Sequence, residues 1–287
     1  MSVVYLNGEY VPASEATIPV GDRGFLFADG IYEVAAAYEG RWLRLDAHVA
    51  RMRAGLQALS IDFDPDALVP VHDELLERNG LSTAPAAIVY VQVTRGVALR
   101  DHVMPQGIAP TVFMMASPMK PPTAEMRHHG VACVTARDFR WERGDIKSTS
   151  LLGNVLARQI SADQGVMETI MFRDGWLTEA ASSNVWIVHE GALLGPPKSE
   201  HVLEGIRVEL LRELCEDVGI AYNLRPISEA DVRAADEVLL SSATKEILPV
   251  TKIDGEPVGH GALRGKPGPV YARLHEAYQR AKAGQSI

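Results

Sequence analysis

Lysine is scarce in this chain, and one lysine stands where it could act as a nucleophile. The chain has seven lysines, and six of them sit beside proline, glycine, charged or turn residues, where we expect them to be solvated. Lys147 differs, because the segment from Asp145 to Ser150 leads directly into an apolar helix start at Leu151-Leu152. Burial disfavours the ammonium form of lysine, and the neutral amine is a nucleophile. A plainer interpretation, in which Lys147 extends its charged end to solvent at a helix entrance, stays open.

A second candidate for chemistry is the basic pair Arg100 and His102, with Asp101 between them. It follows Val93–Gly96, which is expected to end a strand, so the pair is expected in a loop. A guanidinium binds a carboxylate through two parallel hydrogen bonds, and such a loop can therefore hold a substrate carboxylate. A loop that is merely solvated is equally consistent with these residues.

The segment from Glu179 to Asn184 is small and polar and precedes a predicted strand, so it is either a turn or a cofactor contact. The sequence contains no GxGxxG, P-loop or HExxH motif. Dinucleotide binding, nucleotide binding and zinc-protease chemistry therefore have no local support.

The elements that must position these residues alternate between hairpins and helices. Asn7-Gly8 and Glu39-Gly40 each stand between short apolar runs and predict two-residue hairpins. A helix is expected after Asp46 as N-cap, followed by a helix at 65–79 and strands at 88–95 and 111–116.

In the second half, Ser228 and Asp231 resemble a capping box that opens a short helix. We expect a hairpin turning at Asp174-Gly175, strands near 131–136, 185–188 and 237–241, and helices near 151–164, 206–218 and after 269. This mixture predicts an α+β protein rather than a regular βαβ alternation. Prolines 118, 121 and 122 interrupt both helix and strand. We therefore expect an N-terminal α+β domain at 1–117, a linker at 118–123 and a C-terminal α+β domain at 124–287.

Composition excludes several classes of partner. The chain has 287 residues, of which 47% are hydrophobic and 23% charged, and its formal net charge is −9. Nucleic acid and anionic membranes need clustered positive charge, so neither is an expected partner. No apolar run approaches about 18 residues and the first residues do not resemble a leader, which predicts a cytoplasmic protein. The spacing of Cys133 and Cys215 suggests neither a metal site nor a disulfide, and Cys215 is expected to be a buried free thiol.

Taken together, these segments resemble the fold-type IV enzymes that use pyridoxal 5′-phosphate (PLP), and most closely the D-amino acid aminotransferases. The resemblance covers nearly the whole chain. Its markers are Asp22–Glu33, His48–Arg51, Gln92–His102, Asp145–Ser148, and Thr178-Glu179 with Ser182–Asn184. Five matching blocks in the same order make coincidence improbable.

The resemblance implies a role for each marker. Lys147 would hold PLP as a Schiff base and move the substrate proton, and Glu179 would keep the pyridine nitrogen protonated. Arg51 would bind the phosphate, together with backbone N–H groups at a helix start. The other implied cofactor contacts are Ser182, Ser183, Asn184, Gly205, Ile206, Arg207, Ser242 and Ala243.

Tyr32, Arg100 and His102 match the residues that hold the substrate carboxylate in D-selective members, although Tyr32 alone would be interpreted as a core aromatic. The resemblance also implies a homodimer, with the active site at the subunit interface and the Arg100–His102 loop supplied by the other subunit. The chain departs from the family where Arg207 replaces a frequent threonine and Ala243 a frequent hydroxyl residue. Arg207 would then either compensate by charge or point to solvent.

The implied reaction is a ping-pong transfer of an amino group from a D-amino acid, of the D-alanine or D-glutamate type, to a 2-oxo acid. The alternatives are a branched-chain L-amino acid aminotransferase of the same fold, an aminodeoxychorismate lyase, and a dimeric binding protein that has lost catalysis. The Arg100 and His102 pair favours the D-amino acid, because it places a cationic carboxylate trap on one side of the site. Fold alone does not decide between them.

Overall fold

The computed structural model describes residues 2–284, which form two compact units. The first unit comprises the residues up to Lys120 together with Ile146–Leu151, and the second comprises Pro121–Asp145 and the residues from Leu152 onward. Lys147 therefore lies in the unit that the N-terminal residues build. The domain boundaries expected from the sequence, 1–117 and 124–287, stay a prediction.

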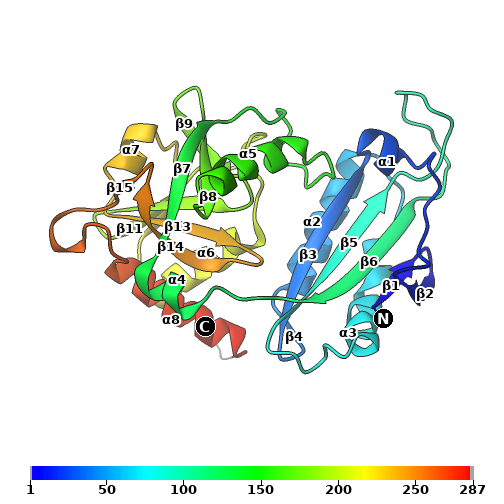
Figure 1. The fold of residues 1–287 in the computed structure, drawn as a ribbon, viewed down its shortest axis with the longest axis horizontal. Helices are drawn as coiled ribbons and strands as arrows, with labels where there is room; N and C mark the ends of the chain where they lie inside the picture. The colour runs from blue at the N-terminus through cyan, green and yellow to red at the C-terminus, as the bar shows by residue number, and fades with distance from the viewer. Residues whose placement is uncertain (1, 285–287) are drawn as a thin grey trace. The chain divides into compact units, whose positions relative to one another are not determined.

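The first unit contains a six-stranded antiparallel sheet in the order β2-β1-β6-β5-β3-β4 (Figure 1). Asn7 and Gly8 both have positive φ in the turn between β1 and β2, and the two predicted hairpins are confirmed. The strands are β1 Val3–Leu6, β2 Glu9–Pro12, β3 Gly30–Tyr38, β4 Arg41–Trp42, β5 Ala87–Thr94 and β6 Thr111–Pro118. The helices are α1 Arg23–Phe27, α2 Leu45–Ala58, a 3-10 turn at Pro65–Leu68 and α3 Val69–Arg78. The expected N-cap Asp46 is wrong. Helix α2 begins at Leu45, so its N-cap is Arg44, two residues before Asp46.

The two faces of this sheet differ in character. Alternate residues of β5, Val89, Val91 and Val93, are fully buried in a core that also contains Met52 and Leu56 of α2 and residues of α3. The other face carries aromatic rings, with Tyr32 stacked on Tyr90 at a centroid distance of 5.7 Å. Because side chains alternate along a strand, the residue after Tyr32 in β3 points back toward the helices.

The second unit contains a nine-stranded mixed sheet in the order β12-β11-β10-β13-β14-β7-β8-β9, with β15 paired to β14. The strands are β7 Val131–Arg137, β8 Glu168–Arg173, β9 Trp176–Ala180, β10 Asn184–His189, β11 Ala192–Gly195, β12 Tyr222–Leu224, β13 Glu237–Ser242, β14 Glu246–Ile253 and β15 Glu256–Pro257. The helices are α4 Ala124–His129, α5 Leu152–Asp163, α6 Ile206–Asp217, α7 Glu229–Arg233, a 3-10 turn at Gly261–Leu263 and α8 Pro269–Lys282. The order of helices and strands confirms the α+β class.

Local sequence signals predicted several features of this unit. The capping box of Ser228 and Asp231 is present at the start of α7. Cys215 is a fully buried free thiol, and burial raises its pKa to about 12. None of the helices within residues 2–284 is both long and apolar enough to cross a bilayer.

Candidate active site

Lys147 lies against the edge of β3 in the first unit. The Tyr32 N–H donates to the Lys147 carbonyl at 3.0 Å, and the Thr149 N–H donates to the Gly30 carbonyl at 3.0 Å. Ile146 is buried in the core beneath the sheet, whereas Lys147 is half-buried. The Lys147 Nζ lies 4.2 Å from the centroid of the Tyr32 ring. The backbone thus fixes this amine beside an aromatic face instead of leaving it on a solvated loop.

Arg51 belongs to a buried group centred on Glu33, the residue of β3 that points toward the helices. The Arg51 Nε donates to Glu33 Oε1 at 2.7 Å, and its Nη2 donates to Oε2 at 2.9 Å. His48 Nδ1 lies 2.7 Å from Glu33 Oε2. Burial raises the pKa of Glu33, but the positive charge of Arg51 and hydrogen bonds from His48 and Arg51 outweigh it and hold the pKa well below its usual range. The carboxylate therefore orients the guanidinium of Arg51.

A half-buried carboxylate, that of Asp29, holds the loop that follows β5. Asp29 accepts from Arg23 Nε at 2.7 Å and from Arg95 through Nε at 2.8 Å and Nη2 at 3.0 Å. Burial raises the pKa of Asp29, and the hydrogen bonds from the two arginines lower it below its usual value. Arg23 also donates from Nη1 to the Asp101 carbonyl at 2.6 Å. A residue of α1 therefore ties down the backbone between Arg100 and His102.

Phe27, the last residue of α1, lies close to both basic side chains of that loop. The Arg100 guanidinium carbon lies 5.3 Å from the Phe27 ring centroid, and the His102 ring centroid lies 5.4 Å from it. Both basic side chains are exposed. The structure thus brings Arg100 and His102 together on one aromatic platform, while Tyr32 lies beside Lys147 on the sheet face.

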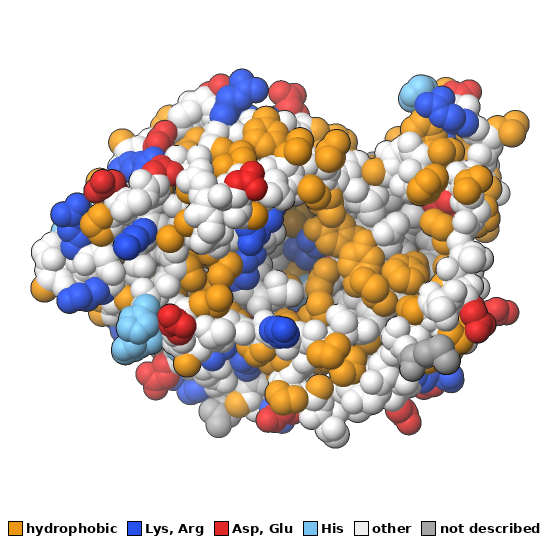
Figure 2. All heavy atoms as spheres, viewed as in Figure 1, with side chains coloured by type: hydrophobic (Ala, Val, Ile, Leu, Met, Phe, Trp, Pro, Cys, Tyr) orange, Lys and Arg blue, Asp and Glu red, His pale blue; other side chains and the backbone are white. Residues whose placement is uncertain are grey.

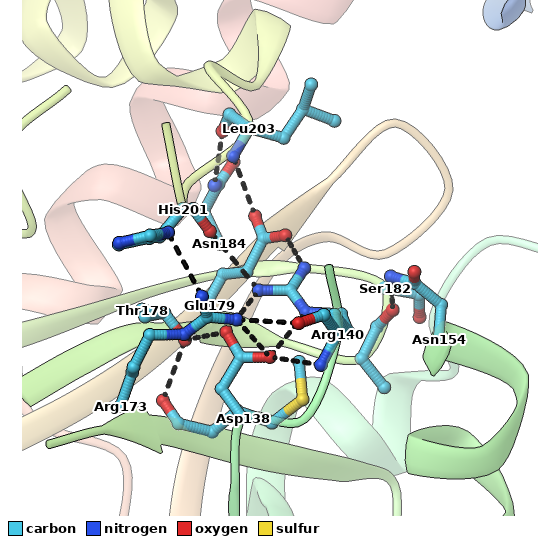
Figure 3. A network of polar contacts seen from close by, with 12 residues as sticks. Asp138, Arg140, Asn154, Arg173, Thr178, Glu179, Ser182, Asn184, His201 and Leu203 are labelled. Carbon is cyan, nitrogen blue, oxygen red and sulfur yellow. Dashed lines mark hydrogen bonds and ion pairs between the residues drawn. The ribbon is translucent and has the colours of Figure 1, made fainter. Parts of the chain in front are cut away.

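In the second unit, Glu179 is buried at the end of β9 within the polar network of Figure 3. Its Oε1 accepts a hydrogen bond from Arg140 Nη1, and its Oε2 accepts from the Leu203 N–H at 3.2 Å. Arg140 also donates to both oxygens of Asp138, at 3.0 and 2.8 Å. Burial lowers the pKa of Arg140, because it disfavours the charged guanidinium. The hydrogen bonds and the negative charges of Asp138 and Glu179 outweigh burial and raise the pKa. A permanent positive charge therefore stands beside Glu179.

Sequence reasoning missed Arg140 and Asp138. A signal was present, since the two residues follow the predicted strand at 131–136 and are spaced so that both side chains leave the same face of an extended chain. Glu179, the partner of Arg140, is 39 positions further along the chain, and only the fold brings the two side chains together.

Ser182 and Ser183 surround another buried carboxylate, that of Glu168 at the start of β8. Glu168 Oε1 accepts from Ser182 Oγ at 2.5 Å, from Ser183 Oγ at 3.1 Å and from Lys245 Nζ at 2.9 Å. Burial raises the pKa of Glu168, and the charge of Lys245 and these hydrogen bonds lower it below its usual value. The two hydroxyl groups are therefore already engaged within the protein.

The expectation that all lysines other than Lys147 are solvated is wrong for two of them. Only 17% of the Lys245 side chain is exposed, because it pairs with the fully buried Glu168. Only 15% of the Lys282 side chain is exposed, because it pairs with the fully buried Glu246 at 2.6 Å. Both carboxylate partners lie far from these lysines in sequence.

The start of α6 is built to leave backbone N–H groups available. Gly205 precedes the helix and supplies no capping side chain, so the first N–H groups of α6 have no such partner. A Cβ at Gly205 would lie 2.0 Å from Asn184 Oδ1, which explains why a glycine stands here. Asn184 is fixed in turn by its Nδ2, which donates to the Leu203 carbonyl at 3.0 Å.

Arg207, the second residue of α6, points into the second unit and is only 1% exposed. Its Nε donates to the Tyr278 hydroxyl at 3.0 Å, and its Nη2 donates to the Ala243 carbonyl at 3.4 Å. The alternative in which Arg207 points to solvent is therefore wrong. Ser242 lies beside Ala243, and its Oγ accepts from the Lys245 N–H at 3.0 Å.

These features fit a phosphate group. A helix start without a capping side chain attracts an anion through its N–H groups and its dipole. Arg207 Nη1 is buried, and among the residues that the structure describes it has no hydrogen-bond partner. The donors and the positive charge are those that a phosphorylated cofactor requires.

The chain is similar to known proteins along nearly its whole length. The family model described as amino-transferase class IV matches residues 30–253. The chain is 35% identical over 283 residues to the D-alanine aminotransferase of Staphylococcus haemolyticus, which covers 98% of each chain. It is 35% identical over 278 residues to the D-alanine aminotransferase of Bacillus licheniformis, which covers 97% of this chain and 96% of the relative.

Solved structures share the fold. The branched-chain amino acid aminotransferase of Escherichia coli has a TM-score of 0.90 at 23% identity, covering 100% of this chain and 96% of the other. A T.th branched-chain enzyme with pyridoxamine 5′-phosphate has a TM-score of 0.89 at 24% identity, covering 99% and 95%. At such identities the similarity concerns the fold alone, and it confirms the fold-type IV architecture.

We predict that Glu33→Gln lowers the free energy of unfolding by about 3 kcal/mol at pH 7, because it removes the buried charge that pairs with the half-buried Arg51. The pKa of Glu33 is lowered in the folded state, so its contribution is present above the ordinary value of 4.5 and is lost as the pH falls. The difference between wild type and variant should therefore narrow below about pH 4.5. Urea unfolding at a series of pH values measures this difference.

The matched control is Glu77→Gln, because Glu77 is exposed on α3. Its effect should stay within about 0.5 kcal/mol at every pH. An equal effect of the two substitutions would contradict the prediction.

Proposed function

The chain belongs to the amino-transferase class IV family, and from that membership we propose its substrates and the residues that carry out its reaction. It is a PLP-dependent transaminase that acts on small amino and 2-oxo acids. We propose that the amino donor is a D-amino acid of the D-alanine or D-glutamate type and that the acceptor is a 2-oxo acid such as pyruvate or 2-oxoglutarate.

The observation that carries this proposal is the placement of Arg100 and His102 on the Phe27 ring. Two basic side chains that lie against the same aromatic ring can together bind a carboxylate. The Arg23 bond to the Asp101 carbonyl limits the movement of the loop, which favours one substrate orientation. The full-length relatives named D-alanine aminotransferase support the same choice, while the branched-chain enzymes share the fold at lower identity.

PLP, when bound, supplies a ring that accepts electrons from the substrate Cα. We propose that Lys147 supplies the amine that holds the cofactor and then takes and returns the Cα proton, because its Nζ is fixed beside the Tyr32 ring. Glu179 holds a negative charge for the ring nitrogen, which raises the pKa of a bound pyridinium. Arg140 positions this carboxylate.

We propose two contributions to phosphate binding, each within its own unit. In the first unit, Glu33 holds Arg51 by its Nε and Nη2 edge, which orients the guanidinium. In the second unit, the N–H groups of Gly205, Ile206 and Arg207 open α6 without a capping side chain. Ser182, Ser183, Asn184, Ser242 and Ala243 remain proposed neighbours of the cofactor. The hydroxyls of Ser182 and Ser183 act through Glu168 and Lys245 in this arrangement.

The first test is spectral titration of the PLP form with D-alanine, D-glutamate, L-leucine and L-valine. We expect the two D-amino acids to bleach the absorbance of the bound aldehyde form, because they convert it to the amine form. Bleaching by L-leucine but not by D-alanine would establish the branched-chain alternative.

Lys147→Ala should bind PLP without a borohydride-reducible adduct and should lose turnover by at least about 10³-fold. An absent adduct in the wild type would favour a binding protein without catalysis.

The second prediction concerns Arg100. Arg100→Met should raise KM for D-alanine about 10- to 100-fold, because a hydrogen-bonded charge contributes about 1.5–3 kcal/mol. The absorbance of bound PLP should not change, since Arg100 is exposed on a loop of the first unit. Arg41→Met, another exposed arginine of that unit, is the control and should leave KM unchanged. An unchanged KM in Arg100→Met would exclude Arg100 as the carboxylate receptor.

The loop that carries Arg100 also exposes large apolar side chains, and we propose that a second copy of this chain covers them. In Figure 2, hydrophobic side chains gather beside basic and histidine side chains where the β5–β6 loop lies. The exposed residues, here called the apolar tip, are Val20 at 79%, Phe25 at 68%, Leu99 at 95%, Val103 at 73% and Met104 at 46%. Such a cluster on one face is typical of an interaction surface.

The cytoplasmic location inferred from the sequence stays a prediction.

We expect the wild type to be a dimer at micromolar concentration in sedimentation equilibrium. The double variant Leu99→Asp with Val103→Asp should dissociate it and raise KM, because both residues flank the proposed carboxylate receptor. Leu263→Asp, at an exposed apolar position of the second unit, should leave the dimer intact. A monomeric wild type would contradict the proposal.

A further inference from the structure

Arg207 is a buried charge without a carboxylate partner. The residue is 1% exposed, and its guanidinium contacts the Tyr278 hydroxyl, the Ala243 carbonyl and the face of the Tyr278 ring, whose centroid lies 5.7 Å away. No carboxylate forms an ion pair with it among residues 2–284, and its Nη1 has no hydrogen-bond partner there. Burial of an unmatched charge costs several kcal/mol.

Every other strongly buried ionic group described above has an oppositely charged partner. Glu33 has Arg51, and Glu179 has Arg140. Glu168 has Lys245. Arg207 departs from this pattern, because no negative charge among the described residues pairs with its positive charge. A positive charge buried in this way is favoured when an anion occupies a site nearby.

The position of Arg207 indicates where that anion lies. Arg207 is the second residue of α6, whose first N–H groups lack a capping side chain. Its Nη2 reaches the carbonyl of Ala243, in the turn between β13 and β14. The helix start is the segment of the second unit proposed above to bind the phosphate. The turn carries Ser242 and Ala243, two of the proposed neighbours of the cofactor. Arg207 and Ala243 are the two residues at which the chain departs from the family pattern, and the hydrogen bond from Arg207 Nη2 to the Ala243 carbonyl joins them.

We propose that Arg207 supplies the positive charge that balances the cofactor phosphate from inside the second unit, in place of the missing hydroxyl donors. The guanidinium is covered by protein, so it acts by charge through the helix start and the turn rather than by direct contact. Charge attraction is strong across protein, where the effective dielectric is far below that of water. Tyr278 and the Ala243 carbonyl hold the guanidinium in position. This inference rests on the proposed phosphate site.

A purely structural role is the competing explanation, since Arg207 also joins α6, α8 and the turn. The two roles differ in one measurable quantity. A structural role affects the binding of PLP and of pyridoxal, its analogue without phosphate, to the same extent. A charge role affects PLP alone. The ratio of the two dissociation constants therefore separates them.

The experiment measures dissociation constants of PLP and pyridoxal for the apo forms of wild type, Arg207→Met and Tyr278→Phe. We expect Arg207→Met to weaken the binding of PLP about 10- to 100-fold, which is the range for two unit charges about 6–12 Å apart at an effective dielectric of about 20. Pyridoxal affinity should change less than about 3-fold. Tyr278→Phe keeps the charge and should preserve the ratio. Arg212→Met removes an exposed charge from the same helix and should also preserve it.

A second readout is thermal stability of the apo protein with and without inorganic phosphate. Phosphate should raise the Tm of the wild type and of Tyr278→Phe, and this increase should be largely lost in Arg207→Met. Without phosphate, Arg207→Met should be as stable as the wild type, because it removes an unmatched charge. If Arg207→Met does not fold, Arg207→Gln is compared with Arg207→Lys, and only the lysine variant should keep the ratio.

Each remaining outcome has a distinct meaning. An equal loss of PLP and pyridoxal affinity in Arg207→Met would assign Arg207 a structural role and overturn the inference. Unchanged PLP affinity would overturn it as well, and both results leave the proposed reaction intact. Failure of the wild type to bind PLP would instead contradict the proposed function itself.

Discussion

Several carboxylates of this protein that are shielded from water are each matched by a cation, and the residues assigned to the reaction depend on these pairs. Glu33, Glu179 and Glu168 are buried and Asp29 is half-buried, and each accepts hydrogen bonds from a basic side chain. Each pair joins elements that are separated in sequence. Breaking a buried pair costs more than the pair itself contributes, because the remaining charge stays buried. The same groups therefore fix both the packing and the orientation of the residues assigned to the reaction.

Sequence patterns predicted the local elements of the fold, such as turns and helix caps, better than they predicted these ion pairs. Turn residues such as Asn7-Gly8 and the capping box at Ser228 act over a few positions, so a short segment is enough to recognise them. Lys245 was expected in solvent because its neighbours are polar, yet its partner Glu168 lies 77 positions away. Arg140 was missed for the same reason. A charge is recognisable as buried only when its partner is known.

The residues matched through the family resemblance fall into two kinds. Lys147 and Glu179 are held by backbone and buried side chains, and their surroundings suit an amine and a fixed negative charge. Ser182 and Ser183 are instead bound to Glu168, so their hydroxyls are less suited to direct cofactor contact than their residue type suggests. Matching residue types thus gave a proposal for the segments of the site, whereas the role of each side chain depends on its neighbours in space.

Ile146–Leu151 belongs to the first unit although the residues on both sides of it belong to the second, so a single cut of the chain does not separate the two units. The chain leaves the first unit after Lys120, returns for six residues that include Lys147, and then leaves again. A cut in the proline-rich segment would therefore yield an N-terminal fragment whose β3 lacks its neighbour at Tyr32 and Gly30. A single crossover between relatives in the proline-rich segment would separate Lys147, the amine proposed for the reaction, from the sheet that holds it, whereas a crossover after Leu151 would keep the two together.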